Sequence, residues 1–168
     1  MDEHRVGLQP VLRRVWAPQG QRPVAAVRPR YEWTYAYGFA RPATGESYWL
    51  LLPAVSGAAF TAALAAFATA TGAGTGKRVV LVLDGAGWHS GKHVAIPDGL
   101  HLVTLPPYSP ELQPVERLWP LTDEALANRQ FADLDALEQA QAARCLTLRE
   151  QPDVVRDLTR FHWWPEAA

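Results

Sequence analysis

The fold is decided by KRVVLVLDGAGWHSGKHVAIPDGLHLVTLPPYSPELQPVERLW, which runs from Lys77 to Trp119. The stretch contains the apolar run Val79–Leu83. The length of this run, its β-branched residues and its flanking glycines predict a strand buried on both faces. Asp84 follows the strand directly. Because ligands bind beyond the carboxyl ends of strands in open α/β sheets, we expect Asp84 at a binding edge.

A second acid follows the next apolar run. That run, Leu100–Leu105, ends at two prolines, which cannot continue a central strand. After a proline-punctuated turn, Pro114 suits the first turn of a helix, and Glu116 lies where the helix dipole favours a carboxylate. Both acids are therefore expected at one edge of the sheet. Taken singly, each has a plainer interpretation: Asp84 as a turn or cap residue, Glu116 as a dipole partner.

Two blocks, LVLDGAGWHSGK and LPPYSPELQPVERLW, together carry a family resemblance. They resemble the catalytic core of the DDE transposases of the mariner superfamily, in particular its bacterial insertion-sequence branch. Its usual pattern is Asp-Asn-x-x-x-His-x-x-Lys after a strand, then Leu-Pro-Pro-Tyr-Ser-Pro-Glu-Leu-Asn-Pro-Ile-Glu-x-x-Trp. The sequence departs from that pattern at Gly85, Gln113 and Val115. By position, Asp84 resembles the second catalytic acid and Glu116 the third.

The first catalytic acid of the family is matched by Asp2, which is followed by Glu3 as is usual there. In the family this acid closes a hydrophobic strand. We therefore expect the chain to lack that strand and the helix-turn-helix DNA-binding region upstream of it. The alternative interpretation is that Asp2 is a frayed terminal residue, because untethered termini are usually disordered.

The order of predicted elements matches an RNase H-like α/β fold, a mixed sheet flanked by helices, as a single catalytic domain over residues 1–168. Residues 11–24 predict a short strand, a turn and a second extended piece. Alternating aromatic residues predict a core-facing strand, with a platform for stacking bases as the alternative. Beyond the central stretch, we expect a hairpin of strands 31–39 and 47–53 and a helix at 57–71. We also expect a helix at 134–150, with Asp133 as its N-cap, and a last short helix that begins at Pro152.

The resemblance implies that Asp2, Asp84 and Glu116 are catalytic and hold two Mg²⁺ ions, for which Mn²⁺ can substitute. Carboxylate oxygens suit these ions better than softer metals. Two such ions activate the attacking oxygen and stabilise the leaving one. His89 and Lys92 are expected on a short helical segment near the same edge, as contacts to DNA, metal or water. The alternative for that pair is plain surface.

Composition limits the function classes. The net charge of −1 shows no basic excess, which argues against a simple phosphate-binding module but suits a metal-dependent nuclease. Arg13 and Arg14 are candidate contacts to DNA phosphates, or else solvated surface. The lone Cys145 excludes an internal disulfide and fits a reducing compartment. With no membrane span or secretion signal in the sequence, we expect a cytoplasmic, nucleoid-associated bacterial protein without a membrane partner.

Three functions stay open at this point. The first is a transposase catalytic domain that cleaves and transfers DNA strands at insertion-element ends, as a homodimer on DNA. The second is a host RNase H-like nuclease. The third is an inactive fragment, or a regulator that pairs with an intact transposase, which the position of Asp2 at the start of the chain favours.

Overall fold

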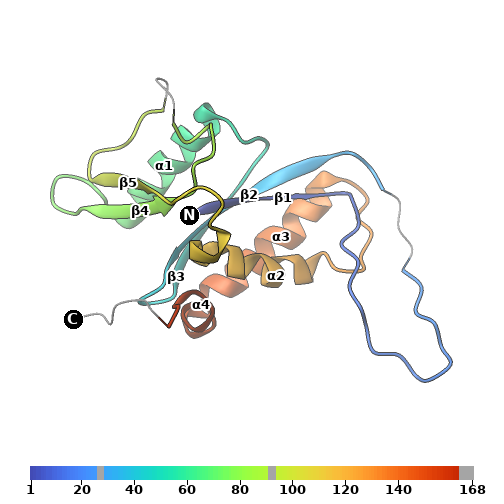
Figure 1. The fold of residues 1–168 in the computed structure, drawn as a ribbon. Helices are drawn as coiled ribbons and strands as arrows, with labels where there is room; N and C mark the ends of the chain where they lie inside the picture. The colour runs from blue at the N-terminus through green and yellow to red at the C-terminus, as the bar shows by residue number, and fades with distance from the viewer. Residues whose placement is uncertain (26–28, 91–93, 163–168) are drawn as a thin grey trace.

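The computed structural model describes residues 1–25, 29–90 and 94–162 of the 168-residue chain. Its strands are β1 (Asp2–Gly7), β2 (Trp33–Arg41), β3 (Glu46–Leu52), β4 (Val79–Leu83) and β5 (Leu100–Thr104). The first three form an antiparallel sheet in the order β1-β2-β3, and β4 pairs with β5 in parallel. The start of β1 lies beside β4 (Figure 1), because the Met1 amine donates a 2.6 Å hydrogen bond to the Val82 carbonyl.

Helix α1 (Gly57–Thr71) covers one face of this arrangement. The Ser56 side chain caps the start of α1 by accepting a hydrogen bond from the Ala59 backbone N–H. Gly72 is the C-cap that follows its last residue. The ring of Phe67 stacks on that of Phe39 in β2 at 4.3 Å between centroids. The aromatic strand was predicted to face the core. This is confirmed for Tyr37 and Phe39 of β2, which are buried in one core cluster with residues of α1.

The remaining helices lie on the other side of the β1-β2-β3 sheet (Figure 1). They are the 3₁₀ helices η1 (Pro110–Leu112), η2 (Pro114–Leu118) and η3 (Asp123–Ala125), and the α-helices α2 (Trp119–Thr122), α3 (Leu134–Arg149) and α4 (Pro152–Thr159). Asp133 caps α3 as predicted, since its side chain accepts from the backbone of Ala136 at 2.8 Å. The strands and the flanking helices confirm the predicted α/β fold class, although the antiparallel β1-β2-β3 strands and the parallel β4-β5 pair form two separate sheets instead of one mixed sheet.

Three local predictions are wrong. Residues 11–24, all of them described, contain no strand, because the segment forms no ladder with a neighbouring strand. The described part of the segment after Asp84, residues 85–90, is a turn rather than a short helix. The alternative interpretation of Asp2 as a frayed terminal residue is also wrong, because Asp2 opens β1 and pairs with Gly38.

The prediction that the Val79–Leu83 strand is buried on both faces is also wrong. Leu81 and Leu83 are buried in the core with α1, whereas Val80 is 64% exposed. On β5, Val103 is 48% exposed. Among the described residues α1 covers one face of this two-stranded sheet, which explains the difference. In the same ranges, every helix is too short or too polar to serve as a membrane span.

Candidate active site

Asp84 lies just beyond the end of β4, as the sequence predicts. Leu83 is buried at the last position of the strand, and the side chain of Asp84 is 54% exposed. Its Oδ1 atom accepts a 3.1 Å hydrogen bond from the backbone N–H of Ala86. The carboxylate is thus held by the turn that follows the strand while still open to solvent.

Glu116 is presented by η2, the 3₁₀ helix that begins at Pro114. Val115 and Leu118 are buried on either side of it and anchor the segment in the core, while Glu116 itself is exposed. The predicted proline start is confirmed, although the first turn is 3₁₀ rather than α-helical. Anchoring by the two apolar neighbours fixes the direction in which the carboxylate leaves the fold.

Asp2 is tied to the same helical segment through Trp119. The indole Nε1 of Trp119 donates a 2.7 Å hydrogen bond to Oδ2 of Asp2. The sheet leaves room for that ring at Gly38, which pairs with Asp2 in the β1-β2 register. A Cβ atom at Gly38 would lie 2.8 Å from the Trp119 ring and 2.8 Å from the side chain of Val115. The absence of a side chain at Gly38 therefore lets this segment dock against β2.

The three acids influence one another electrostatically. Burial raises the pKa of Glu116, and the charges of Asp2 and Asp84 raise it further. Burial also raises the pKa of Asp2, against the opposing effect of the Trp119 hydrogen bond. Such charge interactions fall off with distance and with solvent screening. The charges of Asp2 on β1 and of Asp84 after β4 therefore act on Glu116 of η2.

A buried ion pair lies behind these acids. The side chains of Glu3 and His89 are only 4% and 3% exposed, with Oε1 and Nε2 2.8 Å apart. The other ring nitrogen of His89, Nδ1, lies 2.9 Å from Oδ1 of Asp84. Burial opposes a positive charge on His89, but the hydrogen bonds and charges of Glu3 and Asp84 outweigh it, so its pKa is raised. The expected DNA contact by His89 is not supported, because its ring is enclosed by protein.

Sequence reasoning did not select Glu3 or Trp119 as functional residues. The signal for Glu3 was its place directly after Asp2, because neighbours on a strand point to opposite faces. The signal for Trp119 was its place three residues after Glu116, on the same helical face. Neither spacing identifies the distant partner, which only the tertiary fold supplies.

The remaining predicted DNA contacts have different surroundings. Arg13 donates a 2.7 Å hydrogen bond to the carbonyl oxygen of Pro120, and its backbone is held by the side chain of Asn128. Arg13 therefore already fixes the segment after β1 to the helices. Arg14 is exposed. Lys92 lies outside the described residues.

Oxygen donors of the kind that Mg²⁺ and Mn²⁺ prefer are present at the acid cluster of Asp2, Asp84 and Glu116. The pKa of Glu116 is raised first by burial and then by the negative charges of neighbouring acids, and a divalent cation would offset those charges. Among the described residues, however, no three His, Cys, Asp or Glu side chains form a ready-made metal site. The oxygen donors of these three acids thus fit the chemistry of such an ion.

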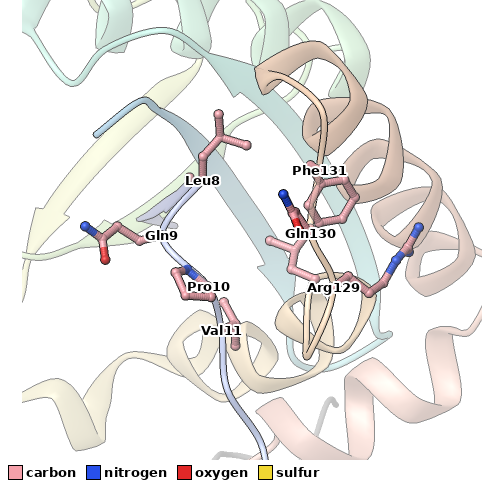
Figure 2. Close-up of a pocket in the computed structure, with 9 residues that line it drawn as sticks. Leu8, Gln9, Pro10, Val11, Arg129, Gln130 and Phe131 are labelled. Atoms are coloured by element: carbon pink, nitrogen blue, oxygen red, sulfur yellow. The ribbon is translucent and has the colours of Figure 1, made fainter. Parts of the chain in front are cut away.

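A small pocket lies at the other end of β1 (Figure 2). Leu8, Val11 and Phe131 line it together with neighbouring residues, and its volume is about 10 Å³. That space holds one water molecule at most. The pocket is therefore no rival to the acid cluster as a site of chemistry.

Sequence comparison gives two matches. A family model described as DDE superfamily endonuclease matches residues 1–138, a range that contains all three acids of the cluster. The uncharacterized protein y4pE/y4sA of Sinorhizobium fredii is 35% identical over 132 residues, which are 78% of this chain and 96% of that protein.

Structural comparison gives Mos1 transposase complexes. The Mos1 strand transfer complex matches with a TM-score of 0.58 at 17% identity, over 97% of this chain and 55% of that chain. The Mos1 mariner paired-end complex with Mn matches with a TM-score of 0.57 at 18% identity, over 95% and 55%. The likeness confirms the RNase H-like fold. The chain spans about half the length of these Mos1 chains.

Proposed function

We propose that this chain, which belongs to the DDE superfamily endonuclease family, cleaves DNA phosphodiester bonds with Asp2, Asp84 and Glu116 as its catalytic acids. The observation that carries the proposal is the electrostatic coupling of the three carboxylates. Asp2 and Asp84 both raise the pKa of Glu116, although the three residues lie on β1, after β4 and on η2. Perturbed acids that converge from separate elements are typical of functional sites.

The acids act as ligands for divalent cations and not as nucleophiles. Mg²⁺ or Mn²⁺ ions held by them would supply charge stabilisation at the attacking and leaving oxygens of a phosphodiester. The rest of the chain orients the carboxylates: Trp119 holds Asp2, and Ala86 with His89 holds Asp84. A side-chain base is not required by this arrangement.

We further propose that the reaction is cleavage and transfer of DNA strands at the ends of a bacterial insertion element, by a homodimer on DNA. The strand transfer and paired-end complexes of the Mos1 neighbours support this finer assignment. The bacterial relative that the chain covers almost entirely supports the branch. Inverted repeats in the DNA that flanks the gene would support the transposase. Their absence would favour a nuclease that serves the host.

A second candidate is a regulator that pairs with an intact transposase without cleaving DNA. The observation in its favour is that the described residues contain no ready-made three-ligand metal group. It predicts DNA or transposase binding with no metal-dependent cleavage.

The test is nicking of supercoiled plasmid by the purified chain with Mn²⁺ or Mg²⁺. Asp84→Asn and Glu116→Gln should abolish nicking, while Asp98→Asn, at an exposed acid outside the cluster, should leave it unchanged. Equal nicking by all four proteins would overturn the proposal. Metal binding that Asp84→Asn removes, without nicking by the unsubstituted chain, would favour the regulator.

A further inference from the structure

The Glu3–His89 pair is a costly feature that the three acids alone do not explain. Glu3 lies on the face of β1 toward α1, opposite Tyr37 in the register, and its side chain is 4% exposed. The His89 ring packs against Phe60 of α1, with centroids 4.5 Å apart. A charged pair in such surroundings loses hydration that its mutual attraction must offset. Charged groups kept in that position are candidates for a specific role.

His89 lies between Glu3 and Asp84 and contacts both. Its Nε2 atom is hydrogen-bonded to the Glu3 carboxylate at 2.8 Å. Its Nδ1 atom is hydrogen-bonded to the backbone carbonyl of Asp84 at 3.2 Å and lies 2.9 Å from Oδ1 of the Asp84 carboxylate, within ion-pair distance. Ionised carboxylates only accept hydrogen bonds, so both ring nitrogens must donate. The ring therefore has one orientation that satisfies both partners at once.

The contact with His89 fixes the carboxylate of Asp84 at one of its oxygens. Oδ1 faces both the His89 ring and the backbone N–H of Ala86, which donates to it at 3.1 Å. The side chain is nevertheless 54% exposed, so the group is oriented without being enclosed. An exposed carboxylate without such a partner would sample several rotamers and lose that freedom on binding a cation.

We propose that Glu3 is a positioning residue, which acts through His89 to fix the rotamer of Asp84 and so raises the affinity of the acid cluster for a divalent cation. The inference rests on the proposed ligand role of Asp84. Partners that orient a metal ligand commonly change metal affinity 10- to 100-fold when they are removed.

The experiment measures Mn²⁺ affinity of the full chain from the electron paramagnetic resonance signal of free Mn²⁺, with thermal unfolding in metal-free buffer beside it. The main variant is the double substitution Glu3→Met/His89→Phe, which keeps the volume and replaces a buried charge pair by apolar groups, a change that proteins often tolerate. Glu3→Gln keeps the shape and an acceptor for His89. Glu32→Gln and His101→Gln, both at exposed positions, are the matched controls.

We expect about a tenfold loss of Mn²⁺ affinity in the double variant, a smaller loss in Glu3→Gln, and unchanged affinity in the controls. In an Asp84→Asn background, the double substitution should cause no further loss of Mn²⁺ affinity. A merely structural role of Glu3 and His89 would instead cause a further loss in that background. If the double variant does not fold, unchanged affinity in Glu3→Gln overturns the inference.

The outcomes separate the two levels of the argument. If Asp84→Asn binds Mn²⁺ more weakly but the double variant binds it as the wild type does, the positioning role of Glu3 is overturned and the ligand role of Asp84 stands. A full additional loss in the Asp84→Asn background overturns it too, because the effect would then bypass Asp84. Wild-type binding in Asp84→Asn overturns the ligand assignment, and the positioning role with it.

Discussion

The indole of Trp119 donates a 2.7 Å hydrogen bond to the carboxylate of Asp2, 117 residues earlier in the chain. Trp119 lies one helical turn after Glu116, and Asp2 is the first residue of β1. One side-chain contact therefore joins the strand that carries the first acid to the segment that carries the third. The relative position of the two acids depends on this contact.

Trp119→Phe removes the donor and keeps most of the ring, which stacks on His4 and meets Trp49 edge-on. We expect a loss of about 1.5–3 kcal/mol in the free energy of unfolding, as is typical for hydrogen bonds to charged groups. We also expect plasmid nicking to slow about tenfold. Trp49→Phe is the control, because its indole donates to Ser47 instead. Equal effects of the two substitutions would contradict the role of the Asp2 contact.

Gly38→Ala places a Cβ atom against the rings and side chains that dock η2 on β2. We expect it to lower the free energy of unfolding by about 1–3 kcal/mol, the usual cost of overpacking, and to reduce nicking by displacing Trp119 from Asp2. Gly76→Ala should be neutral, since a Cβ there meets no atom within 4 Å. Urea unfolding of both variants checks this, and an unaffected Gly38→Ala would show that the segment can shift freely.

Glu116→Gln should stabilise the metal-free protein at neutral pH. The raised pKa of Glu116 means that the folded state holds its proton more firmly than the unfolded state, whose value is near 4.5. Stability therefore falls as pH rises through the window above that value, and the substitution removes this fall. Because the residue is exposed, we expect a gain of at most about 1 kcal/mol. Thermal unfolding between pH 4 and 7 measures it, with Glu138→Gln on α3 as the control.

Stability should also depend on pH through His89. Its raised folded-state pKa means that its contribution is fully present below the unfolded value of 6.5 and is lost as pH rises through the folded value. Subtracting the unfolding free energies of Glu3→Met/His89→Phe from those of the wild type between pH 6 and 9 isolates this effect. The difference should shrink as pH rises. A constant difference would show that His89 keeps one protonation state throughout.

Metal binding should stabilise the wild type more than the acid variants. A ligand that binds only the folded state stabilises the protein. When the ligand is in excess, the gain grows with the logarithm of the ratio of ligand concentration to dissociation constant. Mn²⁺ should therefore raise the unfolding temperature of the wild type, and chelation should reverse the rise. Asp84→Asn should show a much smaller rise. An equal rise in both proteins would place the ion elsewhere.

Local sequence patterns predicted the elements well where the signal is itself local. The strand expected from the apolar run Val79–Leu83 and the helix expected at residues 57–71 both have their predicted bounds, as β4 and α1. Asp133 identified the start of α3 because a capping hydrogen bond spans only three residues. Burial of β4 was overestimated, since an apolar run does not reveal whether a second layer covers it.

The supports of the site could not be predicted in the same way. Glu3 meets His89 across 86 residues, and Trp119 meets Asp2 across 117. These meetings follow from strand register and helix docking, which no local period encodes. Asp84 and Glu116 were recognisable because each follows a boundary that the sequence marks, the end of a strand or a proline, whereas Asp2 was matched through the family resemblance alone.

Six residues of β1 pair with β2, and this short ladder sets which neighbour faces which layer. A slip of one residue would turn Asp2 toward α1 and Glu3 toward Trp119, since every side chain on a strand changes sides together. Both the cluster and the pair behind it would be lost in a single step, with each strand still intact. The integrity of the site is thus a property of register, and a substitution that loosens the β1-β2 ladder can silence the chain without touching an acid.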